Sequence, residues 1–120
     1  MKRDLEKFRK ILFYLEEHLE AGSTISSTAL PFYDKGNNQE YNILIEHVRL
    51  LSESGLIEER HVPTEYNILR ITAQGHDFLD ALRNETVWNK TKEKMKELGS
   101  SSLGLAIKLA IEYGFDQLKN

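Results

Sequence analysis

Several features that define common protein classes are missing from this 120-residue chain. It contains no cysteine, so neither a disulfide framework nor thiolate chemistry is available to it. No apolar run is long enough to span a bilayer, and the basic pair Lys2-Arg3 is not followed by the apolar stretch of a secretory signal. These absences predict a cytoplasmic protein without a membrane partner.

Catalytic signatures are equally scarce. The sequence holds no Ser-His-Asp arrangement and no glycine-rich phosphate loop. Glu16 and Glu17 beside His18 are interpreted as a solvated helix face, because no nucleophile accompanies them. His76 and Asp80 are one helical turn apart, a spacing that metals use, but no third ligand is evident. We therefore expect no enzymatic activity, no cofactor and no metal.

The charge balance argues against a dedicated nucleic-acid binder. Acids outnumber bases by 19 to 16, which gives a formal net charge of −3 and a pI near 5.8. Nucleic-acid-binding domains are usually basic, because contacts with phosphates supply much of their affinity.

The length and a hydrophobic content of 40% are consistent with one ordinary globular core.

The N-terminal third predicts a helix followed by a short strand. Asp4 is a candidate N-cap, and apolar residues at alternating spacings of three and four predict one buried stripe. Its members are Leu5, Phe8, Leu12, Leu15 and Leu19. Within residues 24–33, where Pro31 excludes a helix, we predict a short extra strand, followed by a turn at 34–36.

The middle of the chain predicts a helix and a hairpin. The helix covers about residues 38–54, and Gly55 then supplies the left-handed backbone that ends many helices. Strands over 56–62 and 65–72, joined by a short turn, form the hairpin. The alternating pattern of the second strand places Leu69 and Ile71 on its inner side.

Three further helices are expected towards the C-terminus. Thr72 is the candidate N-cap of the first, which turns Gly75 and its apolar neighbours inward. The second covers roughly 85–98 and contains Trp88, interpreted as a core anchor or an interface hot spot. The third follows a serine-rich joint. We divide the chain into a core at 1–84 and a helical extension at 85–120, packed on the core or on a second subunit.

Two segments carry a resemblance to the winged-helix superfamily. Residues 47–57, His-Val-Arg-Leu-Leu-Ser-Glu-Ser-Gly-Leu-Ile, look like the end of a recognition helix entering the first wing strand. Residues 69–79 resemble the second wing strand entering the following helix. The resemblance implies an α+β fold, mostly α: a winged-helix domain with a two-stranded wing, the extra strand near 24–33, and additional C-terminal helices.

A narrower resemblance covers nearly the whole chain. The opening Met1-Lys2-Arg3-Asp4, the Gly-His-Asp-Phe-Leu-Asp run at 75–80 and Thr86-Val87-Trp88-Asn89-Lys90 are similar to domain-of-unknown-function family 2513. That family consists of small bacterial and prophage proteins. The resemblance implies a bacterial or phage origin and a cytoplasmic setting, and it implies no particular activity. Function therefore has to be argued from sites.

The helix over 38–54 and the wing supply candidate DNA contacts. In winged-helix proteins such a helix enters the major groove, where Asn and Gln bind adenine, while basic wing residues suit phosphate or the minor groove. The candidates are Asn38, Gln39, Asn42, Arg49, Arg60, His61 and Arg70. They predict a DNA-binding transcriptional regulator whose partner is double-stranded DNA.

Three observations oppose that interpretation. The free face of the helix carries more acid than base, and residues 34–60 hold six acids against three bases. Residues 22–36 show no clear helix where the first helix of a helix-turn-helix unit belongs. The alternative is a non-DNA-binding interaction or adaptor module, which binds a protein partner through the winged-helix scaffold and the C-terminal helix. Both interpretations stay open at this point.

The last helix has a continuous apolar face. Candidate dimer-interface residues on it are Leu103, Ile107, Ala110, Ile111, Phe115 and Leu118. Winged-helix proteins often dimerise through added terminal helices, so a homodimer is the hypothesis for this face. The other interpretation is that the helix folds back on its own domain.

Overall fold

The computed structural model describes residues 1–119, in which helices surround a small sheet. In chain order its elements are α1 (Leu5–His18), β1 (Ile25–Ser26), the 3-10 helix η1 (Ser27–Ala29), α2 (Asn38–Glu53), β2 (Ile57–Val62), β3 (Glu65–Ile71), α3 (Ala73–Leu82), α4 (Glu85–Glu97) and α5 (Leu103–Lys119). The fold is α+β and mostly helical, as predicted. Within residues 1–119, no helix combines the length and the apolar character that crossing a bilayer requires.

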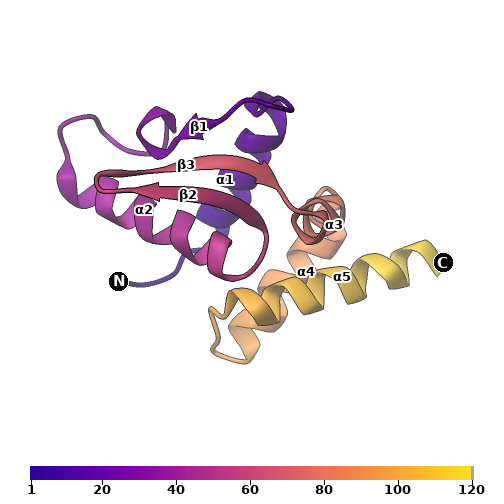
Figure 1. Cartoon of the computed structure of the whole chain (residues 1–120). Helices are drawn as coiled ribbons and strands as arrows, with labels where there is room; N and C mark the ends of the chain where they lie inside the picture. Colours follow the sequence, from indigo (N-terminus) through magenta and orange to yellow (C-terminus); the bar gives the residue numbers. More distant parts are fainter. Residues whose placement is uncertain (120) are drawn as a thin grey trace.

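The sheet is antiparallel, with β3 in the centre and β1 and β2 on either side. Ile25 of β1 pairs with Ile68, and Ile57 of β2 pairs with Ile71. Figure 1 shows the long β2–β3 hairpin with α1 crossing behind it and α2 beside α1, while α3, α4 and α5 gather beyond one end of the hairpin. The short strand expected within 24–33 is therefore confirmed as β1.

Helix α1 follows from its sequence pattern. The Asp4 carboxylate accepts a hydrogen bond from the backbone N–H of Glu6 at 3.0 Å and so caps the helix. Phe8, Leu12 and Leu15 are buried. Burial of each such side chain stabilises the folded state by roughly 1.5–3 kcal/mol. The ends of the predicted stripe, Leu5 and Leu19, are only half-buried.

The expectation for Leu69 was wrong because β3 contains a bulge. Glu58 pairs with Arg70, but its neighbour Glu59 pairs with Ile68, so Leu69 is an extra residue on β3. The extra residue shifts the alternation by one position. Tyr66, Ile68 and Ile71 face the core, and Leu69 is half-buried.

Two glycines hold the base of the hairpin. Gly55 has φ +76°, the left-handed conformation expected after α2. Gly75 in α3 lies so close to the sheet that a Cβ there would overlap the carbonyl oxygen of Leu56. Between them, the Thr72 hydroxyl caps α3 by accepting from the Gly75 N–H at 3.0 Å and donates to the Gly55 carbonyl at 2.5 Å. The predicted helix end and helix start are thus joined directly.

The C-terminal helices share the core of the N-terminal elements. Val87 and Trp88 of α4 and Leu103 and Ile107 of α5 belong to the same buried cluster as α1, α2 and the sheet. Helix α5 lies against both α3 and α4. Figure 1 shows the last turns of α5 extending beyond α3, towards the C-terminus.

Candidate functional site

The candidate base-contacting residues lie at the start of α2. Asn38, Gln39 and Asn42 are all exposed on its first turns. The helix cap is the preceding residue, Asn37, whose side-chain oxygen accepts from the backbone N–H of Glu40 at 3.1 Å. The three candidates therefore have no capping role, and they form part of a solvated helix face.

The arginine of that face is held by glutamates of its own helix. Arg49 lies 2.5 Å from a carboxylate oxygen of Glu46 and 3.9 Å from one of Glu53. The hydrogen bond with Glu46, assisted by the charges of Glu46 and Glu53, raises the pKa of Arg49 above its ordinary value. The negative charges of these carboxylates repel a phosphate that approaches the guanidinium, so the face offers little to a polyanion.

The hairpin shows the same arrangement. Arg70 on β3 pairs with Glu58 on β2 at 3.1 Å, and this contact raises the pKa of Arg70 and lowers that of Glu58. The ring of His61 stacks on Tyr66 with 4.6 Å between centroids. Among residues 1–119, Arg60 is the candidate base to which the structure gives no ion pair.

We call the exposed side chains of α2, β2 and β3 the α2–hairpin face. The segment that contains it, residues 34–70, carries a net charge of −3. Its acids are Asp34, Glu40, Glu46, Glu53, Glu58, Glu59 and Glu65, and its bases are Lys35, Arg49, Arg60 and Arg70. The fold brings the candidate DNA contacts to one side of the molecule, but it brings their glutamate partners there too.

The six candidate dimer residues of α5 separate into two groups. Leu103, Ile107 and Ala110 are buried in the core of their own chain, so the fold does not leave them available to a second subunit. The exposed group consists of Ile111, Phe115 and Leu118, at 38%, 58% and 87% exposure. Sequence periodicity placed all six on one face, but only the part of α5 that lies over the core is covered.

The exposed group borders a groove between α3 and α5, which we call the α3–α5 groove. It has a volume of about 460 Å³. Its floor includes Ala81 and Gly114, where the helices approach so closely that a Cβ on Gly114 would lie 3.3 Å from that of Ala81. Asp77 and Asp80 line it on the α3 side. The groove therefore combines an apolar floor with an acidic rim.

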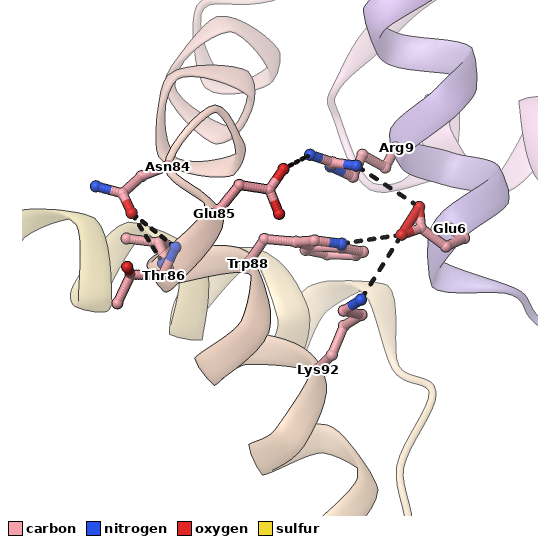
Figure 2. A network of polar contacts seen from close by, with 8 residues as sticks. Glu6, Arg9, Asn84, Glu85, Thr86, Trp88 and Lys92 are labelled. Atoms are coloured by element: carbon pink, nitrogen blue, oxygen red, sulfur yellow. Dashed lines mark hydrogen bonds and ion pairs between the residues drawn. The ribbon is translucent and has the colours of Figure 1, made fainter.

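A polar network joins α1 to α4, and Figure 2 shows its members converging on Glu6. The indole N–H of Trp88 donates to the Glu6 carboxylate at 3.0 Å, and Lys92 lies 3.8 Å from the same oxygen. Arg9 bridges Glu6 and Glu85, at 3.9 and 3.2 Å. Trp88 is 2% exposed, with the cations of Arg9 and Lys92 each 5.3 Å from its ring. Trp88 is therefore a core anchor of α4.

A buried histidine, His47, was not among the site residues predicted from the sequence. His47 on α2 is fully buried, and its Nδ1 donates to the Ile43 carbonyl at 2.8 Å. Its Nε2 accepts from the backbone N–H of Asp4 at 3.0 Å, so the ring is neutral. Burial lowers the pKa of His47 below its ordinary value of 6.5. No short motif marks this contact, because its partners are 43 residues apart.

No group of three or more metal-ligating side chains gathers anywhere in residues 1–119. His76 and Asp80, which have metal-compatible spacing, are both exposed on α3. The described part of the chain thus offers surfaces and grooves as its candidate sites.

Comparison with known proteins places the chain in a family. An uncharacterized protein of Haemophilus influenzae is 33% identical to it over 111 residues, which cover 89% of this chain and 86% of that protein. No solved structure matches the chain. A family model described as "Hypothetical protein (DUF2513)" matches residues 2–102, in agreement with the resemblance predicted from the sequence. The chain therefore belongs to the DUF2513 family.

Proposed function

We propose that this protein is a non-enzymatic interaction module of winged-helix architecture, which binds a protein partner in the α3–α5 groove. The element order helix, strand, helix, hairpin, helix supports the architecture. The three-residue η1 stands where a helix-turn-helix unit has its first helix. The same proposal holds that the protein acts in the cytoplasm of a bacterium and that its gene comes from a prophage.

The observation that carries the proposal is the exposed apolar surface of α5. Ile111, Phe115 and Leu118 are three of the five large hydrophobic side chains that residues 1–118 expose, and they border one groove. Contiguous apolar surface of this kind commonly marks a protein–protein contact. On the α2–hairpin face, by contrast, Arg49 and Arg70 are neutralised by their own glutamates.

The charges of the groove indicate the chemistry of the partner. Asp77 and Asp80 lie on its α3 side, and Glu112 and Asp116 are exposed on α5. Arg83 offsets one of these charges by contact with Asp80 at 3.4 Å. A segment with apolar side chains flanked by lysine or arginine complements this surface. A twofold-related second copy would bring the same acids against each other, so a heterologous partner fits better than a homodimer.

A pair of designed peptides tests this proposal. One is a helical peptide of leucine and lysine, and the other has the same length and leucine positions but glutamate in place of lysine. Anisotropy of the labelled lysine peptide should show saturable binding to the wild-type protein and none for the glutamate peptide. Ile111→Glu and Leu118→Glu should each weaken binding about tenfold, the scale of an interface hot spot.

Leu98→Glu is the matched control, because Leu98 is 53% exposed and lies outside the groove. It should leave binding of the lysine peptide unchanged. Equal weakening by all three variants would contradict a site at the groove. Light scattering supplies a second check, since a dimer at micromolar concentration that Leu118→Glu converts to monomer would favour the homodimer instead.

A DNA-binding regulator is the second candidate function. It is favoured by the exposure of Asn38, Gln39 and Asn42 at the start of α2 and by Arg60, which has no ion pair among the described residues. Binding to mixed duplex DNA across a salt series tests it. A regulator that uses this face should lose affinity with Arg60→Ala, and its log–log salt slope should fall by roughly 0.9 for each lost phosphate contact. Unchanged binding in that variant would exclude the α2–hairpin face.

A further inference from the structure

A second cleft lies on another side of the molecule, between the N-terminal segment and α4. It has a volume of about 510 Å³, and residues of the loop that joins α4 to α5 help to line it. We call it the N-terminal cleft. Its charged lining residues are Lys2, Arg3, Asp4, Glu6, Lys92 and Lys96, and Ser100 and Ser101 add hydroxyl groups.

The two acids of the cleft are already engaged with the protein. The Asp4 carboxylate caps α1 through the Glu6 N–H, at 3.0 Å. The Glu6 carboxylate accepts from the Trp88 indole at 3.0 Å and lies within 4 Å of both Arg9 and Lys92 (Figure 2). Neither acid pairs with the remaining cations of the cleft.

Lys2, Arg3 and Lys96 are therefore available. All three are exposed, and the structure gives none of them an ion pair within residues 1–119. The charge distribution along the chain supports the same conclusion. Residues 1–10 hold five bases against two acids, whereas residues 11–80 hold four bases against twelve acids. Folding brings the basic N-terminal segment beside the lysines of α4.

The backbone segments that carry these cations are attached to the core. The backbone N–H of Asp4 donates to Nε2 of the buried His47, which ties the segment that carries Lys2 and Arg3 to α2. On the opposite wall, Trp88 and Met95 anchor α4 at 2% and 1% exposure. The cleft is thus a built arrangement of cations on two anchored walls.

We propose that the N-terminal cleft binds ligands that carry two or more neighbouring phosphate groups. Guanidinium and ammonium groups with nearby hydroxyls form a donor set suited to phosphate oxygens. Cations on both walls can engage adjacent phosphates at once, which a single carboxylate or a single phosphate cannot exploit. The cleft lies apart from the α3–α5 groove, so this inference does not depend on the proposed function.

Calorimetric titration with sodium tripolyphosphate at an ionic strength of about 0.1 M tests the proposal, because charges more than about 10 Å apart are largely screened there. The wild-type protein should bind tripolyphosphate at one site, and inorganic orthophosphate should bind more weakly. The double variant Arg3→Gln/Lys96→Gln should bind tripolyphosphate at least about tenfold more weakly, the scale of one charged hydrogen bond. Neither side chain has an ion pair to lose, so the thermal unfolding midpoint should stay close to that of the wild type.

The matched control is Lys90→Gln/Lys94→Gln, which removes the same two charges from the side of α4 that lies by Tyr113. It should change the affinity by less than about twofold, because charges distant from the ligand are screened by salt and solvent. Equal weakening by the two double variants would reduce the effect to net charge and overturn the proposal. Absence of tripolyphosphate binding, or equal affinity for orthophosphate, would overturn it as well.

Competition with labelled duplex DNA identifies the source of the phosphates. If DNA binds to the wild type, is displaced by tripolyphosphate and does not bind to Arg3→Gln/Lys96→Gln, the phosphates belong to a nucleic-acid backbone. If tripolyphosphate binds with the same variant dependence and DNA does not, they belong to a small phosphorylated ligand. DNA that binds but resists tripolyphosphate, and that the double variant still binds, uses another surface, and the phosphates of the cleft then also belong to a small ligand.

Discussion

The α2–hairpin face and the N-terminal cleft both carry basic residues, but within residues 1–119 the cleft leaves more of them without an ion pair. Lys2, Arg3 and Lys96 are unpaired in the cleft, whereas Arg60 is the unpaired arginine of the face. On α2 the acids lie three positions before and four after Arg49, the spacing at which helical side chains meet. In the cleft, Asp4 and Glu6 are engaged by a helix N-terminus, an indole and other cations. What a basic surface can bind therefore depends less on the number of its bases than on what their neighbouring acids already bind.

We expect the greatest loss of stability from a change at Trp88, which lies at the wall of the cleft and away from the α2–hairpin face. Replacing Trp88 with alanine should destabilise the protein by about 3–5 kcal/mol, because it empties the space between α1 and α4 and removes the bond to Glu6. Trp88→Phe keeps most of the ring and should cost clearly less. Urea unfolding followed by circular dichroism measures both. A Trp88→Ala variant as stable as the wild type would show that Trp88 does not anchor the wall of the cleft.

Gly75→Ala should disturb the base of the hairpin and spare the cleft. The added Cβ meets the backbone oxygen of Leu56 and a methyl group of Ile71, so we expect a loss of about 1–3 kcal/mol in unfolding free energy. Gly104→Ala at the start of α5 is the control, since its nearest neighbour is 3.8 Å away. It should be neutral or slightly stabilising. Thermal unfolding that ranked the two variants in the opposite order would refute the close approach.

His47 couples the two regions, and its titration should do so as well. Because its folded-state pKa lies below 6.5, the unfolded chain binds the proton more tightly. Its stabilising contribution is present above pH 6.5 and is lost as the pH falls below that value, at no more than about 1.4 kcal/mol per pH unit. Charged neighbours that act on it are Lys7, Asp4 and Glu46.

Chemical unfolding measured from about pH 7.5 to about pH 5 checks this dependence. His47→Gln should flatten the dependence on pH, and His18→Gln, which changes an exposed residue on α1, should keep it. A wild-type stability that rises on acidification through this window would contradict a buried neutral His47.

The smallest effect tests whether glutamates alone silence the α2–hairpin face. Glu46→Gln/Glu53→Gln frees Arg49, so the salt slope for duplex DNA should become steeper by roughly 0.9, the value for one added phosphate contact. The control Glu112→Gln/Asp116→Asn makes the same change in net charge on α5. If both variants steepened the slope equally, net charge and not the pairing of Arg49 would explain the weak binding of DNA by the α2–hairpin face.

Local structure was predictable from short stretches of sequence. Asp4 and Thr72 cap helices because their side chains reach backbone N–H groups two or three residues away. Gly55 ends α2 for an equally local reason, its positive φ. Leu69 was misplaced, because a bulge depends on how two strands pair, and periodicity within one strand does not reveal it.

The candidate sites were predictable only in part. The seven candidate DNA contacts were named from the sequence, and all seven lie exposed at the surface. The glutamates that pair with Arg49 and Arg70, however, decide what that surface can bind. The α5 face was named as one interface, yet Leu103 and Ile107 are buried in their own chain. Periodicity shows that side chains share a face, and packing decides how much of that face is covered.

The order of residues was enough for the elements, their caps and their apolar faces, because those features arise from contacts within a few positions of the chain. Which charges remain available depends on contacts between distant parts of the chain. The bond from Asp4 to His47 spans 43 residues and the bond from Trp88 to Glu6 spans 82. The Glu6 carboxylate is paired with the distant Trp88 and Lys92, and within residues 1–119 it forms no ion pair with Lys2, Arg3 or Lys96. No local pattern of charges contains that information.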